Sequence, residues 1–216
     1  MRALLLVALL LQGCGMEPPE WANERVTVGR GRPWRLPVPV VLDPSLSLEQ
    51  RDYIKQAIEE WTRLAGVSFV GRTDEADFVR IKAVEEGACH SNVGMIGGAQ
   101  EIAMAPGCRA KAARHELGHT LGLFHEQQRA DRDEFVVVTT DFLEDQGNKG
   151  NFTKQPTYRP AAAYDYDSIM HYGSYDFGDG RRVIERIGGD PDIRPPGLIT
   201  DLDADKVRAM YQSQQP

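Results

Sequence analysis

The chain has few cysteines, no surplus of basic residues and no apolar segment long enough for repeated membrane crossing. Three cysteines in 216 residues are too few for a disulfide-rich scaffold and leave one without a partner. Asp and Glu outnumber Lys and Arg by 32 to 25, and no basic cluster stands out, so we expect no nucleic-acid partner. The 41% hydrophobic content excludes wholesale disorder and favours one globular domain with a tail.

The N-terminal residues have the pattern of an export signal. Met1 and Arg2 precede nine apolar residues, 3–11, which span about 14 Å as a helix, against about 30 Å for a bilayer core. Residues 11–14 read Leu-Gln-Gly-Cys and resemble the cleavage box of bacterial lipoproteins, in which the cysteine carries lipid. We therefore predict a signal peptide over 1–13 and a lipid on Cys14 that holds the exported chain on a bacterial membrane, facing the periplasm or the outside. The alternative is a plain secretory signal with an incidental cysteine.

Export determines the expected state of the remaining cysteines. If Cys14 carries lipid, Cys89 and Cys108 are the two thiols left, and an oxidising compartment allows them to pair. We predict a Cys89–Cys108 disulfide, with two buried free thiols as the alternative.

The pattern of apolar residues predicts an α+β domain over 34–216, preceded by a linker or arm over 14–33. Pro37 and Pro39 favour an edge position for a strand at 34–42, because proline lacks the amide needed inside a sheet. Ser47 and Gln50 form a capping-box pattern at the start of a helix over about 47–65. Further elements are expected as strands at 67–70 and 77–81, a short apolar piece at 101–105 within a Gly-rich stretch, a helix at 111–121, and a helix at 201–211 capped by Thr200 or Asp201.

Residues 115–126 carry the residues expected to do chemistry. His115 and His119 are four apart, so on a helix both imidazoles leave the same face, as a zinc ion requires. Glu116 then flanks the metal, where a base can take a proton from water. Gly122 is placed to end the helix in a left-handed conformation and to turn His125 back as the third ligand.

Three protein ligands leave a fourth position open, which is typical of a catalytic zinc. Three of the five histidines of the chain fall in this segment, and we expect one Zn²⁺ per chain. The alternative is a buried helix whose histidines are hydrogen-bonded within the core. It offers no reason for three imidazoles and a carboxylate in one place.

The pattern HExxHxxGxxH at 115–125 resembles that of the metzincin zinc peptidases, and Glu126 after the third histidine is similar to the astacin branch. Residues 168–172 resemble the Met-turn, which would put Met170 beneath the zinc as a hydrophobic base and not as a ligand. Tyr172 matches the tyrosine that astacins place near the metal. Similarity extends from Trp34 to about Tyr211, and includes the segments 87–94, 97–100, 107–108 and 129–133.

The resemblance implies a five-stranded twisted sheet with helices above a horizontal cleft, and a loop-rich lower lobe. An extended protein or peptide substrate would pair with an edge strand from residues 89–104, where His90 is expected as an exposed rim residue. Tyr172 would bind zinc at rest and then stabilise the oxyanion, the alternative being a packed turn residue. In processed astacins the residue matching Glu126 meets the N-terminus; a lipidated Cys14 offers no free amine, so Arg129 or Arg132 is its expected partner.

These expectations together predict a monomeric, exported zinc metalloendopeptidase that uses Glu116 to assist the attack of a zinc-held water on internal peptide bonds. Three alternatives remain. A lipid-anchored module would keep the zinc without cutting; a structural zinc site would need a fourth protein ligand; an exopeptidase would need a charged group that closes the cleft.

Overall fold

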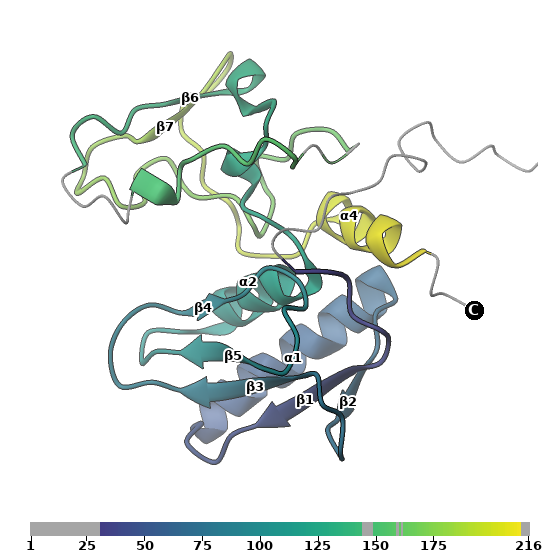
Figure 1. Cartoon of the computed structure of the whole chain (residues 1–216). Helices are drawn as coiled ribbons and strands as arrows, with labels where there is room; N and C mark the ends of the chain where they lie inside the picture. Colours follow the sequence, from purple (N-terminus) through teal and green to yellow (C-terminus); the bar gives the residue numbers. More distant parts are fainter. Residues whose placement is uncertain (1–30, 144–148, 159, 161, 213–216) are drawn as a thin grey trace, which may run out of the picture.

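The computed structural model describes residues 31–143, 149–158, 160 and 162–212. The predicted signal segment, Cys14 and the predicted arm up to residue 30 lie outside the described residues. The described chain forms two lobes, a sheet lobe (residues 31–122, with the last helix packed on it) and a loop lobe (residues 123–200). Figure 1 shows helix α2, Ala110–Leu121, on the side of the sheet lobe that faces the loop lobe. None of the helices in the described ranges combines the length and apolar character of a membrane span.

The sheet lobe contains a mixed five-stranded sheet. Its strands lie in the spatial order β2-β1-β3-β5-β4, and only β4 runs antiparallel to its neighbour. Helix α1, Leu48–Ala65, covers one face of this sheet. The predicted α+β class with five strands is confirmed; the strands are β1 Val38–Leu42, β2 Phe69–Gly71, β3 Phe78–Ala83, β4 His90–Ser91 and β5 Ala99–Met104.

The predicted edge position of the first strand is wrong. Strand β1 lies inside the sheet, between β2 and β3. Its pairing with β3 begins at Val40, beyond both prolines, and on the other side Val38 donates its amide to the carbonyl of Ser68. Neighbouring residues of a strand direct their backbone hydrogen bonds to opposite sides, so the backbone of Pro39 faces β3. At this position β1 and β3 are not yet paired, so the missing amide of Pro39 removes no hydrogen bond from the sheet.

The three predicted helices are confirmed, and two of them begin with capping boxes. In α1 the Ser47 hydroxyl accepts from the Gln50 amide at 3.1 Å, and the Gln50 side chain accepts from the Ser47 amide at 3.1 Å. Helix α4, Asp201–Tyr211, has Thr200 as its N-cap in the same motif. Trp61 of α1 is fully buried and donates its indole N–H to the carbonyl of Arg114 at 3.0 Å, which ties α1 to α2.

The disulfide between Cys89 and Cys108 is confirmed, with 6.0 Å between the two Cα atoms. Cys89 directly precedes β4, and Cys108 directly precedes Arg109, the N-cap residue of α2. The bond therefore fixes the edge strand of the sheet to the start of the helix that carries His115.

The loop lobe has little regular structure. Strands β6, Val136–Val138, and β7, Ile184–Arg186, form an antiparallel pair. Two 3₁₀ turns, η2 Glu126–Gln128 and η3 Arg132–Glu134, precede β6 in the chain. Three-residue strands are too short for a periodic pattern, so the sequence did not predict this pair. The lobe has its own apolar cluster, formed by Val136, Leu143, Phe152, Tyr164, Val183, Ile184 and Ile193.

Candidate active site

Helix α2 and the turn after it bring three histidines together. His115 and His119 lie on α2, which ends at Gly122 in a left-handed conformation, with φ 113°. The turn places the Nε2 atom of His125 at 3.1 Å from the Nε2 atoms of both His115 and His119. Nε2 atoms around a tetrahedral zinc lie about 3.3 Å apart, given Zn–N bonds of about 2.0–2.1 Å, so the observed spacing fits this metal.

The other ring nitrogen of each histidine is held by the protein. These three hydrogen bonds leave each Nε2 atom free to face the shared point, and outer partners of this kind orient metal-binding histidines. The contacts are His115 Nδ1 to the Ile169 carbonyl at 2.8 Å, His119 Nδ1 to the Leu123 carbonyl at 2.7 Å, and His125 Nδ1 to Gln128 Oε1 at 3.0 Å.

Burial keeps these imidazoles neutral. It lowers the pKa of His115 to about 4 and, with a further contribution from the neighbouring His115, the pKa of His119 to about 3. The pKa of His125 lies well below its usual value for the same reason. Neutral imidazole is the form that binds a metal, so the group is prepared to take a zinc ion at pH 7.

Glu116 lies buried beside the three histidines in the same cleft. Its Oε2 atom makes no hydrogen bond to any of the described residues. Burial raises the pKa of Glu116 to about 8 in the metal-free protein, and a cation nearby would lower it again. A buried carboxylate without a partner is costly, so its presence indicates that the oxygen has a reacting group to meet.

The Met-turn lies directly under α2. Met170 is buried, and a Cβ atom built on Gly118 would stand 2.6 Å from the Met170 sulfur. A side chain at residue 118 would therefore displace Met170. Gly118 lies between His115 and His119, and no spacing in the sequence indicates its role; only the contact with Met170 shows why a glycine is needed.

Tyr172 stands at the side of the histidine group. Its ring centre lies 4.4 Å from that of His125, 5.2 Å from Phe177 and 5.8 Å from Phe152. Burial raises the pKa of the Tyr172 hydroxyl above its usual value, so the group stays protonated and can donate a hydrogen bond. The Gln127 side chain accepts from the Tyr172 amide at 3.1 Å, which fixes this end of the turn.

The histidines open into a cleft of about 790 Å³ between the lobes. One wall comes from β4, where His90 is exposed at the rim as expected, and from the residues Arg109 and Lys111. Asn151, Asp176 and Phe177 of the loop lobe form part of the other wall. Because β4 is the last strand of the sheet, the cleft runs beside a strand edge that an extended peptide can pair with.

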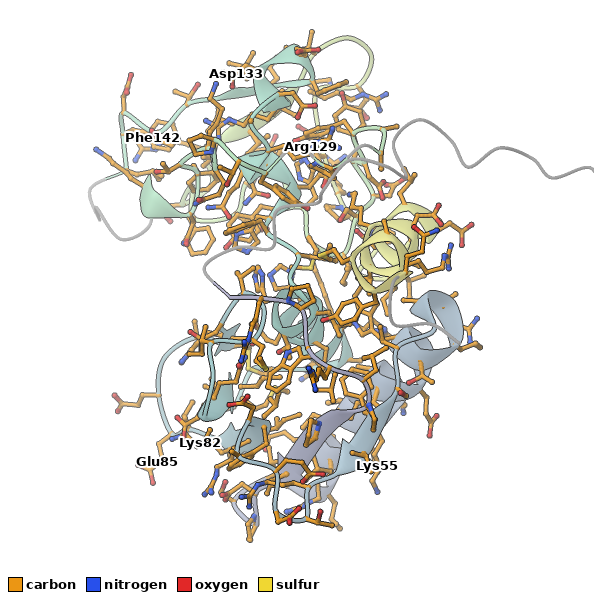
Figure 2. The ribbon with its side chains drawn as sticks, turned by 45° about the vertical axis from the view of Figure 1, so that its right-hand side comes forward. Lys55, Lys82, Glu85, Arg129, Asp133 and Phe142 are labelled. Carbon is orange, nitrogen blue, oxygen red and sulfur yellow. A yellow bond between two sulfur atoms is a disulfide. The ribbon has the colours of Figure 1, made fainter. Side chains whose placement is uncertain are left out.

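Glu126 is fully buried and meets two cations. Arg129 donates to its Oε1 atom at 3.0 Å, as one of the two expected pairings proposed, and Lys206 of α4 donates to Oε2 at 2.7 Å. The other expectation is wrong, because Arg132 pairs with Asp133 at 3.1 Å. Figure 2 shows Arg129 within the loop lobe, while Asp133 lies farther from the sheet lobe. Burial would raise the pKa of Glu126, but Lys206 and Arg129 together bring it below the usual value.

Two lobes, a helix with paired histidines, a third histidine after a left-handed glycine, and a methionine turn underneath define the metzincin class of zinc peptidase fold. The chain belongs to the astacin family of peptidases, whose family model matches residues 27–193.

Relatives of this chain occur in animals. It is 35% identical to embryonic protein UVS.2 of Xenopus laevis over 187 residues, which cover 82% of this chain and 35% of that protein. It is 34% identical to zinc metalloproteinase nas-14 of Caenorhabditis elegans over 182 residues, 81% of this chain and 36% of that protein. The chain thus spans about a third of the length of these relatives.

Solved structures resemble the fold as well. High choriolytic enzyme 1, a hatching enzyme zinc-protease from Oryzias latipes, matches with a TM-score of 0.72 and 31% identity, over 81% of this chain and 88% of that one. Myroilysin matches with a TM-score of 0.57 and 17% identity, over 83% of this chain and 92% of that one, which shows a shared fold.

Proposed function

We propose that this protein is an exported zinc endopeptidase that hydrolyses internal peptide bonds of proteins or peptides. The observation that carries the proposal is the convergence of three Nε2 atoms beside the unpartnered Oε2 atom of Glu116, in a cleft open to a strand edge. Membership of a peptidase family supports the same conclusion.

One zinc per chain would be held by His115, His119 and His125, whose neutral Nε2 atoms form a suitable donor set. When bound, zinc supplies Lewis acidity, which activates a water and polarises the scissile carbonyl. Among the described residues, the group of His, Cys, Asp and Glu side chains placed to hold a metal consists of these three histidines, and Tyr172 stands beside them.

Glu116 would act as the general base and then as the general acid. Its Oε2 atom takes a proton from the attacking water and returns that proton to the nitrogen of the leaving amine. A cation held by the three histidines would lower the pKa that burial raises, so the carboxylate would be ionised and able to accept the proton near neutral pH.

Tyr172 would donate a hydrogen bond from its hydroxyl to the oxygen that becomes negative in the transition state. Its high pKa keeps the proton available, and its packing between His125 and Phe177 keeps the ring beside the metal. The substrate backbone would pair with β4, which places the scissile bond above the histidine group.

The test combines metal analysis with proteolysis. Purified protein is expected to contain one zinc by elemental analysis and to cleave unfolded casein at internal bonds; chelation abolishes cleavage and added zinc restores it. Zinc without cleavage would indicate the binding module. Release of single terminal residues would indicate the exopeptidase, and zinc that resists chelation and takes no part in cleavage would indicate a structural site.

Export and lipid anchoring need a separate experiment, because Cys14 lies outside the described residues. Full-length protein made in a bacterial host is expected to sediment with membranes and to carry the mass of a lipid on Cys14. The variant Cys14→Ser is expected to remain unprocessed or to become soluble. A soluble wild-type chain whose first residue lies elsewhere would contradict the lipoprotein assignment.

A further inference from the structure

A group of buried charges lies beneath the histidine site, and the proposed reaction does not use it. Glu126 and Arg129 come from the segment after His125, whereas Asp203 and Lys206 come from α4. All four residues are buried, with Lys206 only 3% exposed. Buried charges persist where each is paired, so this arrangement constrains how the two segments fit together.

Lys206 stands between the two carboxylates of this group. Its ammonium donates to Glu126 Oε2 at 2.7 Å and lies 4.0 Å from Asp203 Oδ1. The other Glu126 oxygen accepts from Arg129 and from the Asp165 amide, each at 3.0 Å. Arg129 also forms an ion pair with Asp131, with 2.8 Å between Nη2 and Oδ2. Lys206 is therefore the cation that neutralises the Glu126 oxygen facing α4.

The four buried charged residues contact backbone that positions two histidines of the site. Glu126 directly follows His125, and its amide donates to the carbonyl of Met170 at 3.1 Å. Asp203 accepts from the amide of Ile169 at 2.8 Å, and the carbonyl of that residue accepts from His115 Nδ1 at 2.8 Å. The position of both imidazoles thus depends on backbone that the buried charges hold.

The contact between α4 and the loop lobe is not a disulfide. Residues 201–216 contain no cysteine, and the one disulfide in the described residues lies in the sheet lobe. Helix α4 contributes Val207 and Tyr211 to the sheet-lobe core, while Asp203 and Lys206 reach the Met-turn and the segment after His125. Helix α4 therefore makes an apolar contact with the sheet lobe and an ionic contact with the loop lobe.

We propose that Lys206 is a positioning residue for the metal site: its ammonium, shared between Glu126 and Asp203, holds the His125 segment and the Met-turn to α4 and so sets how tightly zinc is held. The inference rests on the proposed zinc site. Removing the charge leaves Glu126 Oε2 and Asp203 Oδ1 buried without the cation that they share, which destabilises the present positions of the His125 segment and the Ile169 peptide.

The experiment measures the zinc dissociation constant of the full chain by competition with a chromophoric chelator. Lys206→Met is expected to weaken zinc binding about 10- to 100-fold, the usual effect of losing an outer partner of a metal site. Lys206→Arg keeps the charge and is expected to recover most of the affinity, which a purely steric role would not allow.

Arg208→Met is the matched control on the same helix. Arg208 pairs with Asp205 and donates to the carbonyl of Leu64 on α1, so its loss weakens the attachment of α4 without touching Glu126. Zinc affinity within about threefold of wild type is expected for this control, since it leaves the outer partners of the site in place. Equal losses in Arg208→Met and Lys206→Met would overturn the proposal, as would wild-type affinity in Lys206→Met.

If Lys206→Met does not fold, the double variant Glu126→Gln with Lys206→Met removes both charges and keeps a polar side chain at 126. It is expected to bind zinc about tenfold more weakly than wild type, because the tie to α4 is gone; unchanged affinity would again overturn the proposal. Zinc affinity is measured without reference to proteolysis. A wild-type chain that binds zinc but cuts nothing therefore refutes the proposed function and leaves the Lys206 test intact.

Discussion

The two lobes supply the site in different ways. The sheet lobe presents His115, Glu116 and His119 from a regular helix, which is fixed by Trp61 on α1 and by the disulfide at its start. The loop lobe presents Tyr172 from a turn held by hydrogen bonds and buried charges. Groups four residues apart on a helix need no distant partner to converge, whereas a turn residue stays in place only if distant residues hold it.

The largest effect is expected from the sheet lobe, at Glu116. Replacement by Gln keeps the shape and removes the base, so kcat for a peptide substrate should fall by about 10²- to 10⁴-fold. Zinc content, measured by elemental analysis, should stay at the wild-type level. A variant that cleaves the substrate near the wild-type rate would show that Glu116 is not the general base.

The disulfide tests how much of the sheet lobe depends on its covalent link. Replacing both Cys89 and Cys108 by Ala should lower the free energy of unfolding by about 3 kcal/mol in the chain-entropy model. The two cysteines are 19 residues apart in the chain. Urea unfolding of this variant should match that of wild type under reductant, and unchanged stability would mean that packing alone holds β4 to α2.

Tyr172→Phe examines the loop lobe's direct part in the reaction. The ring and its packing remain, and only the hydroxyl is lost, so kcat should fall by about 10²-fold, as for one oxyanion donor. KM should change less than about threefold, because the hydrogen bond forms in the transition state. A large rise in KM at constant kcat would instead make Tyr172 a substrate-binding group.

Gly118→Ala probes the contact where the lobes meet. The added methyl group must push Met170 aside, and overpacking of this kind costs about 1–3 kcal/mol of folding free energy. The matched control is Gly71→Ala, because a Cβ atom there meets nothing within 4 Å. Thermal unfolding of both variants checks the prediction, and equal midpoints would show that Met170 moves at no cost.

The last prediction concerns a pH slope of the folding stability in zinc-depleted protein. The pKa of His119 falls from 6.5 to about 3 on folding, mainly through burial, so the unfolded chain binds more protons in this range. The stability that neutral His119 contributes is complete above about pH 6.5 and is lost as pH falls toward 3. Replacing His119 by Gln should remove up to about 1.4 kcal/mol per pH unit of this slope.

Local features of this chain were predictable because they depend on near neighbours. The capping box at Ser47, the approximate helix limits and the shared face of His115 and His119 follow from spacings of three or four residues, whereas the choice of Thr200 over Asp201 as N-cap came from the structure. The interior place of β1 was not predictable, because it depends on where β3 begins to pair, about 40 residues later in the chain.

The sequence by itself determined the face of α2 that bears two histidines and Glu116, and the turn at Gly122, because helix geometry and the left-handed preference of glycine are local. Only the tertiary structure decided that Gly118 faces Met170 and that Lys206 meets Glu126, 80 residues away in the chain. The first contact forms when the Met-turn packs against α2, and the second when α4, packed on α1, meets the segment after His125. Their partners are chosen by buried volume and by the need to pair buried charge, which no local spacing encodes.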